Sequence, residues 1–370
     1  MQNKKDLAIT YVFNSGREKF INNSHFSKEF LYFYPQVSEK YNGVEYLEVN
    51  ENSKINFFLN IYKYMEKILS KILKVPLFGY KILNIKNMKR LAKSKHIILT
   101  TENIGYSLTV FIFFLKLFKS FKVTIFFMGI SNINPNKLGR LFTLLMFSTF
   151  DNLLFLSKGE KDYVSKDFSS YSYKMSYLPF SIDINFWKNK NEIIEKKDLI
   201  LFNGNDLQRD YSFLQDLIDN LPHFKFLILS KRFETISGNT ELIKTNMRKP
   251  KITDHELKKI YEKSFVSIIP LIQTKQPSGQ SVAMQSMAMR VPVIMTKTNG
   301  FWDHELFEDT QNIFLKNNIL KEWINIINRI YEEPEYANKV TNSALNVIEK
   351  NYSYLKISED FFRLLDGDKS

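Results

Sequence analysis

The stretch that decides the fold is PSGQSVAMQSMAMRVPVIMT, residues 277–296. From Ser281 onward, apolar residues recur at the spacing of one helix face: Met284, Met287, Ala288 and Val291. Pro292 then opens the β-branched run Val293–Ile294, and a strand tolerates proline at its first position. Loop, short helix and strand therefore follow one another. The helix start gathers backbone N–H groups over residues 279–282, and such a start attracts anions.

The rest of the chain repeats this alternation of strands and helices. In the second half we expect strands at 199–204, 224–230 and 264–272, a helix at 209–220, and a further helix opened by the capping box of Thr253 and Glu256. The first half follows the pattern less regularly, with expected strands at 7–13, 44–49, 95–101, 122–128, 151–157 and 173–179. Apolar strands that alternate with helices predict an α/β fold with doubly wound parallel sheets.

The length of 370 residues suits two such domains. We expect a linker at 188–198, KNKNEIIEKKD, because this segment is charged and poor in apolar residues. The predicted organisation is an N-terminal Rossmann-like domain over 1–190, a C-terminal Rossmann-like domain over 191–350, and a C-terminal helix over 351–370 that returns to the N-terminal domain. Ligands of doubly wound sheets bind at the carboxyl ends of strands, so a ligand-binding cleft between the two sheets is expected.

The composition excludes several classes of protein. The chain has no cysteine, so it has neither a disulfide framework nor thiolate chemistry, as expected for a reducing compartment. We find no signal peptide at its start. The most apolar stretch, 107–129, is interrupted by Lys116, Lys119 and Lys122, and it predicts a helix followed by a buried strand and no membrane span. A cytoplasmic protein is the expectation.

The excess of positive charge is confined to the first half of the chain. Residues 1–190 hold 28 Lys and Arg against 14 Asp and Glu, whereas residues 191–370 hold 24 against 25. A basic half predicts an anionic partner, such as a membrane surface, lipid phosphate or nucleic acid. Residues 55–74 carry two stripes at helical spacing, a basic one of Lys63, Lys67, Lys71 and Lys74 and an apolar one of Phe58, Ile61, Met65, Ile68 and Ile72. This pattern fits a core-facing helix, or peripheral contact with the inner face of an anionic membrane.

Four stretches, in this order and spacing, resemble the retaining family-4 glycosyltransferases of the GT-B fold: DNLLFLSKGEKDYV (151–164), LPFSIDINFW (178–187), LFNGNDLQRDY (201–211) and PSGQSVAMQSMAMRVPVIMTKTNGFWD (277–303). The resemblance covers roughly residues 150–365. It implies two Rossmann-like doubly wound domains and the transfer of a sugar from a nucleotide-sugar donor.

The resemblance also shows where this chain departs from the family. The family pattern has a glutamate, seven residues and a second glutamate, followed by Ala-Met-Ala and Pro-Val-Ile. In that frame Pro277 replaces the first glutamate, which touches the donor sugar, and Gln285 replaces the second, which holds the ribose hydroxyls. An amide can still bond a diol, although it carries no charge. Arg290 replaces the usual helix-ending glycine, at a cost of about 1 kcal/mol where φ is positive.

Further donor-site residues follow from the resemblance. The family places a basic residue after the strand that ends at Gly204, where it neutralises the donor diphosphate, and Arg209 stands at about this offset. The alternative for Arg209 is a surface arginine beside its acidic neighbour. Asn205 and Asp206 on the same loop are expected to bond phosphate, ribose or each other. Asp303 falls at the family's acidic position near the donor sugar, or else it caps a helix.

Backbone groups complete the expected donor site. The loop ahead of the helix is expected to present N–H groups to the diphosphate through Ser278, Gly279, Gln280 and Ser281. Gly16 and Arg17 follow the first strand, where relatives place a loop near the acceptor and the donor phosphates. Phe180 occupies a turn that lines the cleft in relatives, or it belongs to the core.

The resemblance implies a mechanism without a protein nucleophile. In such a retaining enzyme the leaving diphosphate takes the acceptor proton, while the protein supplies positioning and positive charge, with Arg209 in the catalytic role. No metal is expected, because the five histidines lack metal-ligand spacing. The expected co-substrate is a nucleotide sugar of the UDP or GDP type. The expected acceptor is a glycan or a lipid-linked molecule in bacterial cell-surface polysaccharide or glycoconjugate synthesis.

Two other functions stay open at this point. A nucleotide-sugar epimerase of the GT-B fold would share the donor pocket. A nucleic-acid-binding protein would explain the sequence pI of 9.4. Because the basic residues are not interleaved with aromatic residues on a recognisable nucleic-acid module, we expect no nucleic-acid partner.

Overall fold

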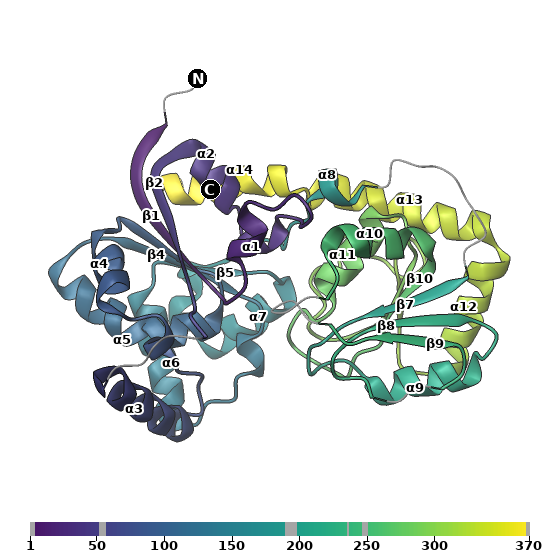
Figure 1. The fold of residues 1–370 in the computed structure, drawn as a ribbon, viewed down its shortest axis with the longest axis horizontal. Coiled ribbons are helices and arrows are strands. Elements are labelled where there is room, and N and C mark those ends of the chain that lie inside the picture. Colours follow the sequence, from purple (N-terminus) through teal and green to yellow (C-terminus); the bar gives the residue numbers. More distant parts are fainter. Residues whose placement is uncertain (1–3, 52–56, 189–197, 235–236, 246–250, 368–370) are drawn as a thin grey trace. The chain divides into compact units, whose positions relative to one another are not determined.

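The computed structural model describes residues 4–51, 57–188, 198–234, 237–245 and 251–367. By its internal contacts the chain divides into two compact units (Figure 1). Unit 1 comprises Met1–Asn22 and Phe30–Leu178, and unit 2 comprises Asn23–Glu29 and Pro179–Ser370. The change of unit after Leu178 precedes the predicted domain boundary at 190/191, and most of the predicted linker, 188–198, lies outside the described residues. The predicted return of the C-terminal helix to the N-terminal domain stays a prediction.

Unit 1 contains one six-stranded parallel sheet in the order β2-β1-β3-β4-β5-β6. Its strands overlap the six predicted ranges: β1 (Lys5–Phe13), β2 (Tyr41–Glu48), β3 (His96–Leu99), β4 (Lys122–Phe127), β5 (Asn152–Phe155) and β6 (Met175–Tyr177). The helices of the unit are α1 (Glu18–Ile21), α2 (Tyr34–Lys40), α3 (Phe57–Leu73), α4 (Ile85–Lys93), α5 (Glu102–Phe118), α6 (Lys137–Thr149) and α7 (Lys158–Asp167), with short 3₁₀ turns η2 (Gly79–Lys81), η3 (Ile130–Asn132) and η4 (Ser169–Lys174). A further 3₁₀ turn, η1 (Glu29–Leu31), begins at the last residue of the unit 2 segment Asn23–Glu29. Parallel strands need such crossover connections.

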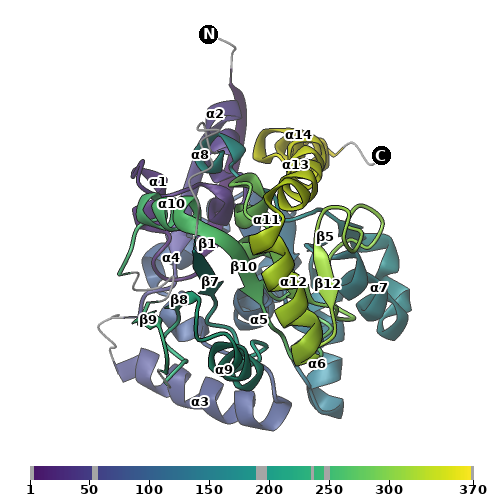
Figure 2. The same cartoon turned by 90° about the vertical axis from the view of Figure 1, so that its right-hand side faces the viewer.

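Unit 2 contains a second six-stranded parallel sheet in the order β12-β11-β10-β7-β8-β9 (Figure 2). Its strands are β7 (Leu199–Asn203), β8 (Lys225–Leu229), β9 (Thr240–Ile243), β10 (Ser264–Ile269), β11 (Val293–Thr296) and β12 (Phe314–Lys316). Its helices are α8 (Ile184–Trp187), α9 (Tyr211–Asn220), α10 (Asp254–Lys263), α11 (Gln280–Ala288), α12 (Leu320–Glu332), α13 (Pro334–Asn351) and α14 (Tyr354–Asp366). The predicted capping box of Thr253 and Glu256 is present at the start of α10.

The order of strands in unit 2 locates a topological switch point. From β7 the chain proceeds to β8 and β9 on one side, whereas β10, β11 and β12 follow on the other side. The connections that leave the carboxyl ends of β7 and β10 therefore diverge, although the two strands are neighbours. Doubly wound sheets bind their ligands at such a point.

Helix α11 is buried on every side, with only Ser281 partly exposed, although its sequence predicts a single apolar face. It packs against β10 and β11 of its own sheet and against α13 and α8. Polar residues of α11 such as Gln285 and Ser286 therefore also lie in the interior. Among the described residues no helix is both long enough and apolar enough to cross a membrane.

Candidate functional site: a buried arginine at the switch point of unit 2

The loop after β7 crosses the switch point and pairs with the loop after β10. The backbone N–H of Asp210 donates to the carbonyl of Pro270 at 3.0 Å, and that of Ile272 donates to the carbonyl of Gln208 at 2.9 Å. Between these bonds, Arg209 forms an antiparallel bridge with Leu271. The backbone of Arg209 is therefore held at the carboxyl ends of two adjacent strands.

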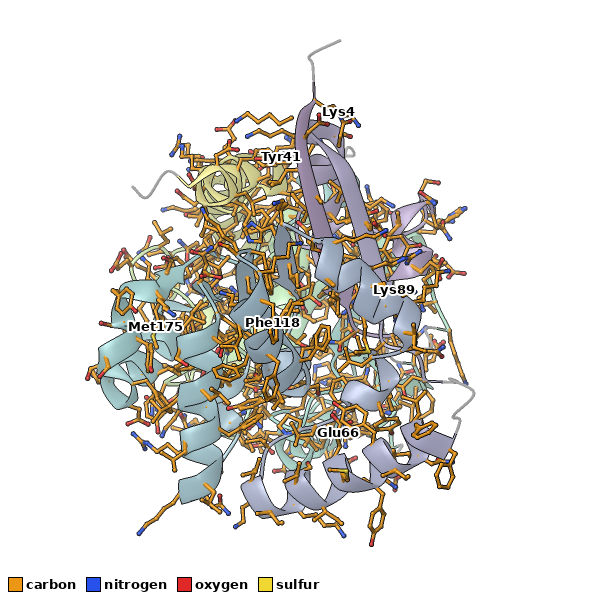
Figure 3. All side chains as sticks on the ribbon, turned by 90° about the vertical axis from the view of Figure 1, so that its left-hand side faces the viewer. Lys4, Tyr41, Glu66, Lys89, Phe118 and Met175 are labelled. Atoms are coloured by element: carbon orange, nitrogen blue, oxygen red, sulfur yellow. The ribbon has the colours of Figure 1, made fainter. Side chains whose placement is uncertain are left out.

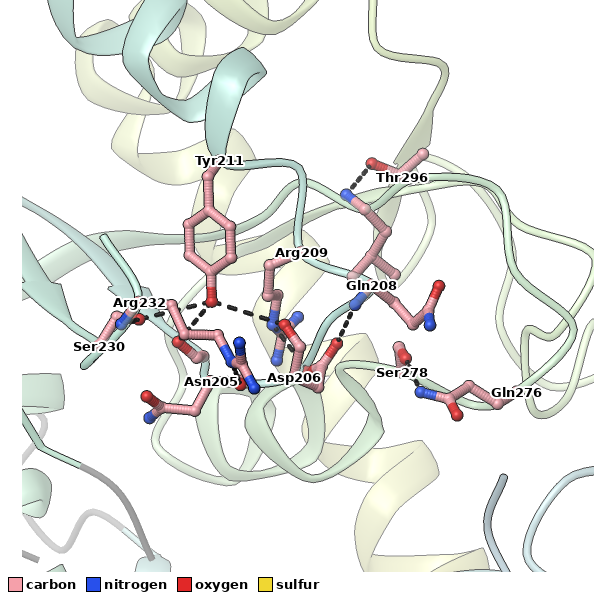
Figure 4. Close-up of polar contacts among 12 residues, drawn as sticks. Asn205, Asp206, Gln208, Arg209, Tyr211, Ser230, Arg232, Gln276, Ser278 and Thr296 are labelled. Carbon is pink, nitrogen blue, oxygen red and sulfur yellow. Dashed lines mark hydrogen bonds and ion pairs between the residues drawn. The ribbon is translucent and has the colours of Figure 1, made fainter. Parts of the chain in front are cut away.

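The side chain of Arg209 is buried and incompletely bonded. Its Nε lies 3.1 Å from Oδ2 of Asp206, but neither Nε nor Nη1 makes a hydrogen bond with any described residue (Figure 4). Two glycines make room for the guanidinium group. A Cβ atom on Gly204 would come within 2.2 Å of Nε, and one on Gly279 would come within 2.9 Å of Nη1. A buried guanidinium group whose N–H donors lack hydrogen bonds is costly even beside one carboxylate, so this group is set up to receive an anion.

The start of α11 lies beside this guanidinium group. Gly279 is the N-cap residue, with φ of 80°, and no side chain caps the helix. Beside it, Ser278 is buried and its hydroxyl accepts a hydrogen bond from Nε2 of Gln276 at 2.7 Å. The positive end of the helix therefore adds to the charge of Arg209 at one point. The structure thus brings together Gly204, Asp206, Arg209 and Gly279 from the predicted set.

A polar network fixes the ends of the neighbouring strands. Thr296, at the end of β11, accepts the N–H of Leu271 at 2.8 Å and donates to Oδ1 of Asn318 at 2.6 Å. The amide nitrogen of Asn318 in turn donates to Oδ2 of Asp210 at 2.8 Å and to the carbonyl of Leu271 at 3.0 Å. These bonds join loops from β7, β10, β11 and β12, and they hold Asp210, which follows Arg209, and Leu271, which pairs with it.

Asn205 connects loops through hydrogen bonds of its side-chain nitrogen, its side-chain oxygen and its backbone carbonyl. Its Nδ2 donates to the carbonyl of Thr245 at 2.9 Å, and its Oδ1 accepts the N–H of Lys231 at 2.8 Å. Its own carbonyl accepts from Nε of Arg232 at 2.7 Å. Lys231 and Arg232 follow β8 and add positive charge beside the β7 loop. The sequence analysis did not predict these two residues. A basic pair directly after the expected strand 224–230 is the pattern that could have indicated them.

Gln285 lies in a buried polar cluster of unit 2. Its Oε1 accepts from the hydroxyl of Tyr261 at 3.3 Å, and its Nε2 donates to Oε1 of Glu29 at 3.0 Å. The same carboxylate oxygen accepts from Nε1 of Trp187 at 2.8 Å. Burial raises the pKa of Glu29 to about 7, helped by the negative charges of Asp254 and Asp183. The amide group of Gln285 is thus bonded within the protein, and its predicted contact with a ribose stays a prediction.

Asp303 holds a turn. It is buried, its Oδ1 accepts the N–H of Glu305 at 3.1 Å, and its Oδ2 accepts from the hydroxyl of Tyr352 at 3.0 Å. No helix begins there in the described chain, so the alternative that Asp303 caps a helix is wrong. Phe180 is also buried, directly after the change of unit.

Gly16 and Arg17 belong to unit 1, where they precede the short helix α1. Gly16 has φ of 88°, as a glycine turn requires. The carboxylate of Glu48, at the end of β2, accepts the backbone N–H groups of Arg17 and of Glu18. The guanidinium of Arg17 lies over the ring of Phe30, 5.0 Å from its centroid. In this structure a carboxylate of the chain itself occupies the amides of that loop.

The described part of the chain contains no group of three or more His, Cys, Asp or Glu side chains that could hold a metal ion. The positive groups gathered at the switch point are Arg209, Lys231, Arg232 and the start of α11. Such an arrangement can bind a phosphate and stabilise negative charge that develops on it.

Several solved structures have a fold similar to that of this chain. The structure of HepE from Anabaena in complex with UDP and glucose matches with a TM-score of 0.67 at 12% identity, and the match covers 98% of this chain and 100% of the HepE chain. Sucrose-phosphate synthase from Thermosynechococcus elongatus has a TM-score of 0.66 at 11% identity, over 97% and 98%. A glycosyltransferase from Rickettsia africae has a TM-score of 0.63 at 13% identity, over 99% and 100%. No protein-family model and no curated protein sequence matches the chain.

These likenesses extend over nearly the whole chain and concern the fold. They confirm the two parallel-sheet domains expected from the four sequence stretches, and in its fold the chain is similar to the retaining glycosyltransferases that the sequence resembles. The chain has the GT-B fold.

Proposed function

We propose that this protein is a retaining glycosyltransferase that takes a sugar from a nucleotide-sugar donor bound at the switch point of unit 2. The observation that carries the proposal is the buried guanidinium of Arg209, whose Nε and Nη1 make no hydrogen bond with the described residues. It lies against Gly204 and Gly279, where backbone can approach a ligand closely. The solved complexes of HepE with UDP-glucose and of starch synthase IV with ADP support a nucleoside diphosphate as the anion.

The reaction follows from this placement of charge. The bond between the anomeric carbon of the sugar and the diphosphate oxygen breaks, and a bond to the acceptor oxygen forms on the same face of the sugar. The acceptor hydroxyl transfers its proton to the departing phosphate oxygen. Arg209 and the start of α11 stabilise the negative charge that grows on the phosphate, and this interaction is stronger in the transition state than in the ground state.

The finer parts of the proposal concern donor and acceptor. We place the diphosphate on Arg209 and on the N–H groups of Ser278–Ser281, with a UDP or GDP moiety as the nucleotide. The acceptor is a glycan or a lipid-linked molecule, in line with the basic first half of the chain. The pathway in this proposal is bacterial cell-surface polysaccharide or glycoconjugate synthesis, with the enzyme on the cytoplasmic side.

A thermal-shift panel of UDP, GDP, CDP, ADP and their sugars tests the donor site first. One nucleoside diphosphate should raise the melting temperature of the wild type, and its sugar should then serve as donor in a turnover assay with product analysis. Arg209→Ala should reduce kcat by at least several tens of fold and donor affinity by less, because the lost contact is strongest in the transition state. A sugar of inverted ring configuration, formed from the donor without an acceptor, would instead indicate an epimerase.

Arg363→Ala is the matched control. This arginine belongs to unit 2, is exposed, and pairs with exposed Asp360 at 3.2 Å. Exposed pairs of this kind contribute little to stability, so the control should keep full turnover. If Arg209→Ala also keeps full turnover with every accepted donor, Arg209 does not clamp the phosphate and the proposal is wrong.

A further inference from the structure

Helix α3 of unit 1 presents an apolar face to the outside. Six large apolar side chains along it are each 41% to 77% exposed: Phe57, Phe58, Ile61, Met65, Ile68 and Ile72. They recur at helical spacing and form one stripe. The sequence left open whether this stripe faces the core or a membrane, and the structure shows that it does not face the core. Residues 55 and 56 of the range considered lie outside the described residues.

The opposite side of α3 is fixed to unit 1 by polar and backbone contacts (Figure 3). The carboxylate of Glu66 is buried, and it accepts the N–H of Gly79 at 2.8 Å and that of Tyr80 at 2.9 Å. Gly139 of α6 lies so close to α3 that a Cβ atom there would come within 2.0 Å of the carbonyl oxygen of Leu73. A helix held by a buried glutamate and by backbone contact cannot rotate to bury its apolar stripe without breaking these bonds.

Helix α6 extends the apolar surface. Its N-cap residue Asn136 donates to the carbonyl of Ile72 at 2.5 Å, so the start of α6 adjoins the end of α3. Leu138 and Leu141, in the first turns of α6, are also exposed. Exposed apolar residues therefore continue beyond the C-terminal end of α3. A continuous surface of this kind marks an interaction site.

Lysines border the stripe along one side. Lys63, Lys67 and Lys71 follow one another at intervals of four residues, and Lys74 comes directly after the helix. Lys67, Lys71 and Lys74 form no salt bridge with any residue that the structure describes. Their positive charge is thus available to a partner.

We propose that α3 docks this protein on a lipid bilayer that contains anionic lipids. The apolar stripe enters the boundary between headgroups and acyl chains, while the lysines lie at the anionic headgroups. The charges select this partner over a second copy of the chain, because pairing two α3 helices would bring two rows of lysines together. Docking brings the enzyme to a lipid-linked acceptor, so this part of the inference rests on the proposed function.

Co-sedimentation with vesicles tests the docking without any activity assay. The full-length protein should bind vesicles of phosphatidylcholine with 30% phosphatidylglycerol, and binding should weaken with added salt and on pure phosphatidylcholine. Lys67→Gln/Lys71→Gln should lower the partition coefficient about 30-fold, taking about 1 kcal/mol for each lysine. Phe57→Ser/Phe58→Ser should lower it at least tenfold, because both rings leave the bilayer.

Phe118→Ser is the matched control, since Phe118 at the end of α5 is 87% exposed but does not belong to the stripe. It should bind as the wild type does. Melting temperatures of all variants should match the wild type, because the substituted side chains are exposed. Equal binding by the wild type and both α3 variants would overturn the inference. A second result would also overturn the inference. The wild type would bind no vesicles and would form a dimer in light scattering, and Phe57→Ser/Phe58→Ser would convert that dimer to a monomer. Absent vesicle binding together with normal sugar transfer to a soluble acceptor would leave the proposed function intact.

Discussion

At the scale of single residues, Gln285 shows why one position departs from the family pattern. Its Nε2 donates to the carboxylate of Glu29 at 3.0 Å. A glutamate at position 285 would place two carboxylates side by side in the interior, where only one could stay ionised. The amide is therefore the group that fits beside Glu29. The sequence could not predict this contact, because the partner lies far away along the chain.

Glu29 itself predicts a dependence of stability on pH. Burial of the carboxyl group raises its pKa from the ordinary value of 4.5 to about 7 in the folded protein. A raised pKa of an acid means that the folded state binds the proton more tightly than the unfolded state. The contribution to stability is fully present below pH 4.5 and is lost as the pH rises through 7. Its full size is on the order of 3 kcal/mol.

Glu29→Gln isolates this contribution, because the amide keeps an acceptor for Trp187 and does not ionise. The difference in melting temperature between variant and wild type should be small at pH 5. It should grow in favour of the variant between pH 5 and pH 8. Comparing the two proteins removes the effect of other buried acids, such as Glu160, whose pKa is also raised by burial. A difference that stays constant over this range would show that Glu29 is already ionised in the folded protein at pH 5.

At the scale of elements, the sequence predicted all six strands of the first sheet and the four inner strands of the second sheet. The two edge strands of the second sheet, β9 (Thr240–Ile243) and β12 (Phe314–Lys316), were missed. Each is short and contains a charged residue, Glu241 in β9 and Lys316 in β12, so neither stands out as an apolar run. For α3, the periodicity predicted a basic and an apolar stripe, but it could not show which side of the helix faces the protein. That side is set by Glu66, which accepts N–H groups of η2, a contact with a segment outside the helix. The loop of Arg209 was predicted from the resemblance, whereas its bridge to Leu271 depends on strand order.

The end of α11 allows a prediction about stability. Arg290 has a positive φ of 55°, the conformation considered for a residue that replaces a helix-ending glycine. The N–H of Val291 donates to the carbonyl of Ser286 at 2.8 Å and closes the turn. A side chain in this left-handed conformation costs about 1 kcal/mol, and glycine removes that cost. Arg290→Gly should therefore raise the melting temperature of the protein by about 1 to 2 °C.

Arg290→Ala serves as the comparison for that substitution. Alanine also removes the guanidinium group, whose Nε is buried without a hydrogen bond among the described residues, but it keeps the Cβ atom and hence the strain. Arg290→Gly should be more stable than Arg290→Ala in thermal unfolding. If alanine is as stable as glycine, the gain comes from removing the arginine side chain and not from the backbone.

At the scale of the whole molecule, the two halves of the sequence differ in charge, and we propose different roles for them. The excess of basic residues lies in residues 1–190, which include α3, whereas residues 191–370, which include Arg209, are close to neutral. Overall positive charge alone would suit any polyanion. The combination of lysines with an exposed apolar stripe on α3 in unit 1 favours an anionic membrane over other polyanions. Substitutions in α3 should therefore weaken membrane docking without changing sugar transfer itself, and substitution of Arg209 should do the reverse.

Sugar transfer to two forms of one acceptor tests this separation. One form carries a long lipid chain in anionic vesicles, and the other carries the same glycan on a short, water-soluble chain. Phe57→Ser/Phe58→Ser should lower transfer to the vesicle-borne form by about the factor by which it lowers vesicle binding, because less enzyme is at the surface. The same variant should transfer to the soluble form at the wild-type rate. Arg209→Ala should lower transfer to both forms equally, because it acts on departure of the diphosphate. If the α3 variant also loses transfer to the soluble form, α3 takes part in acceptor binding or catalysis, and the separation of docking from chemistry is wrong.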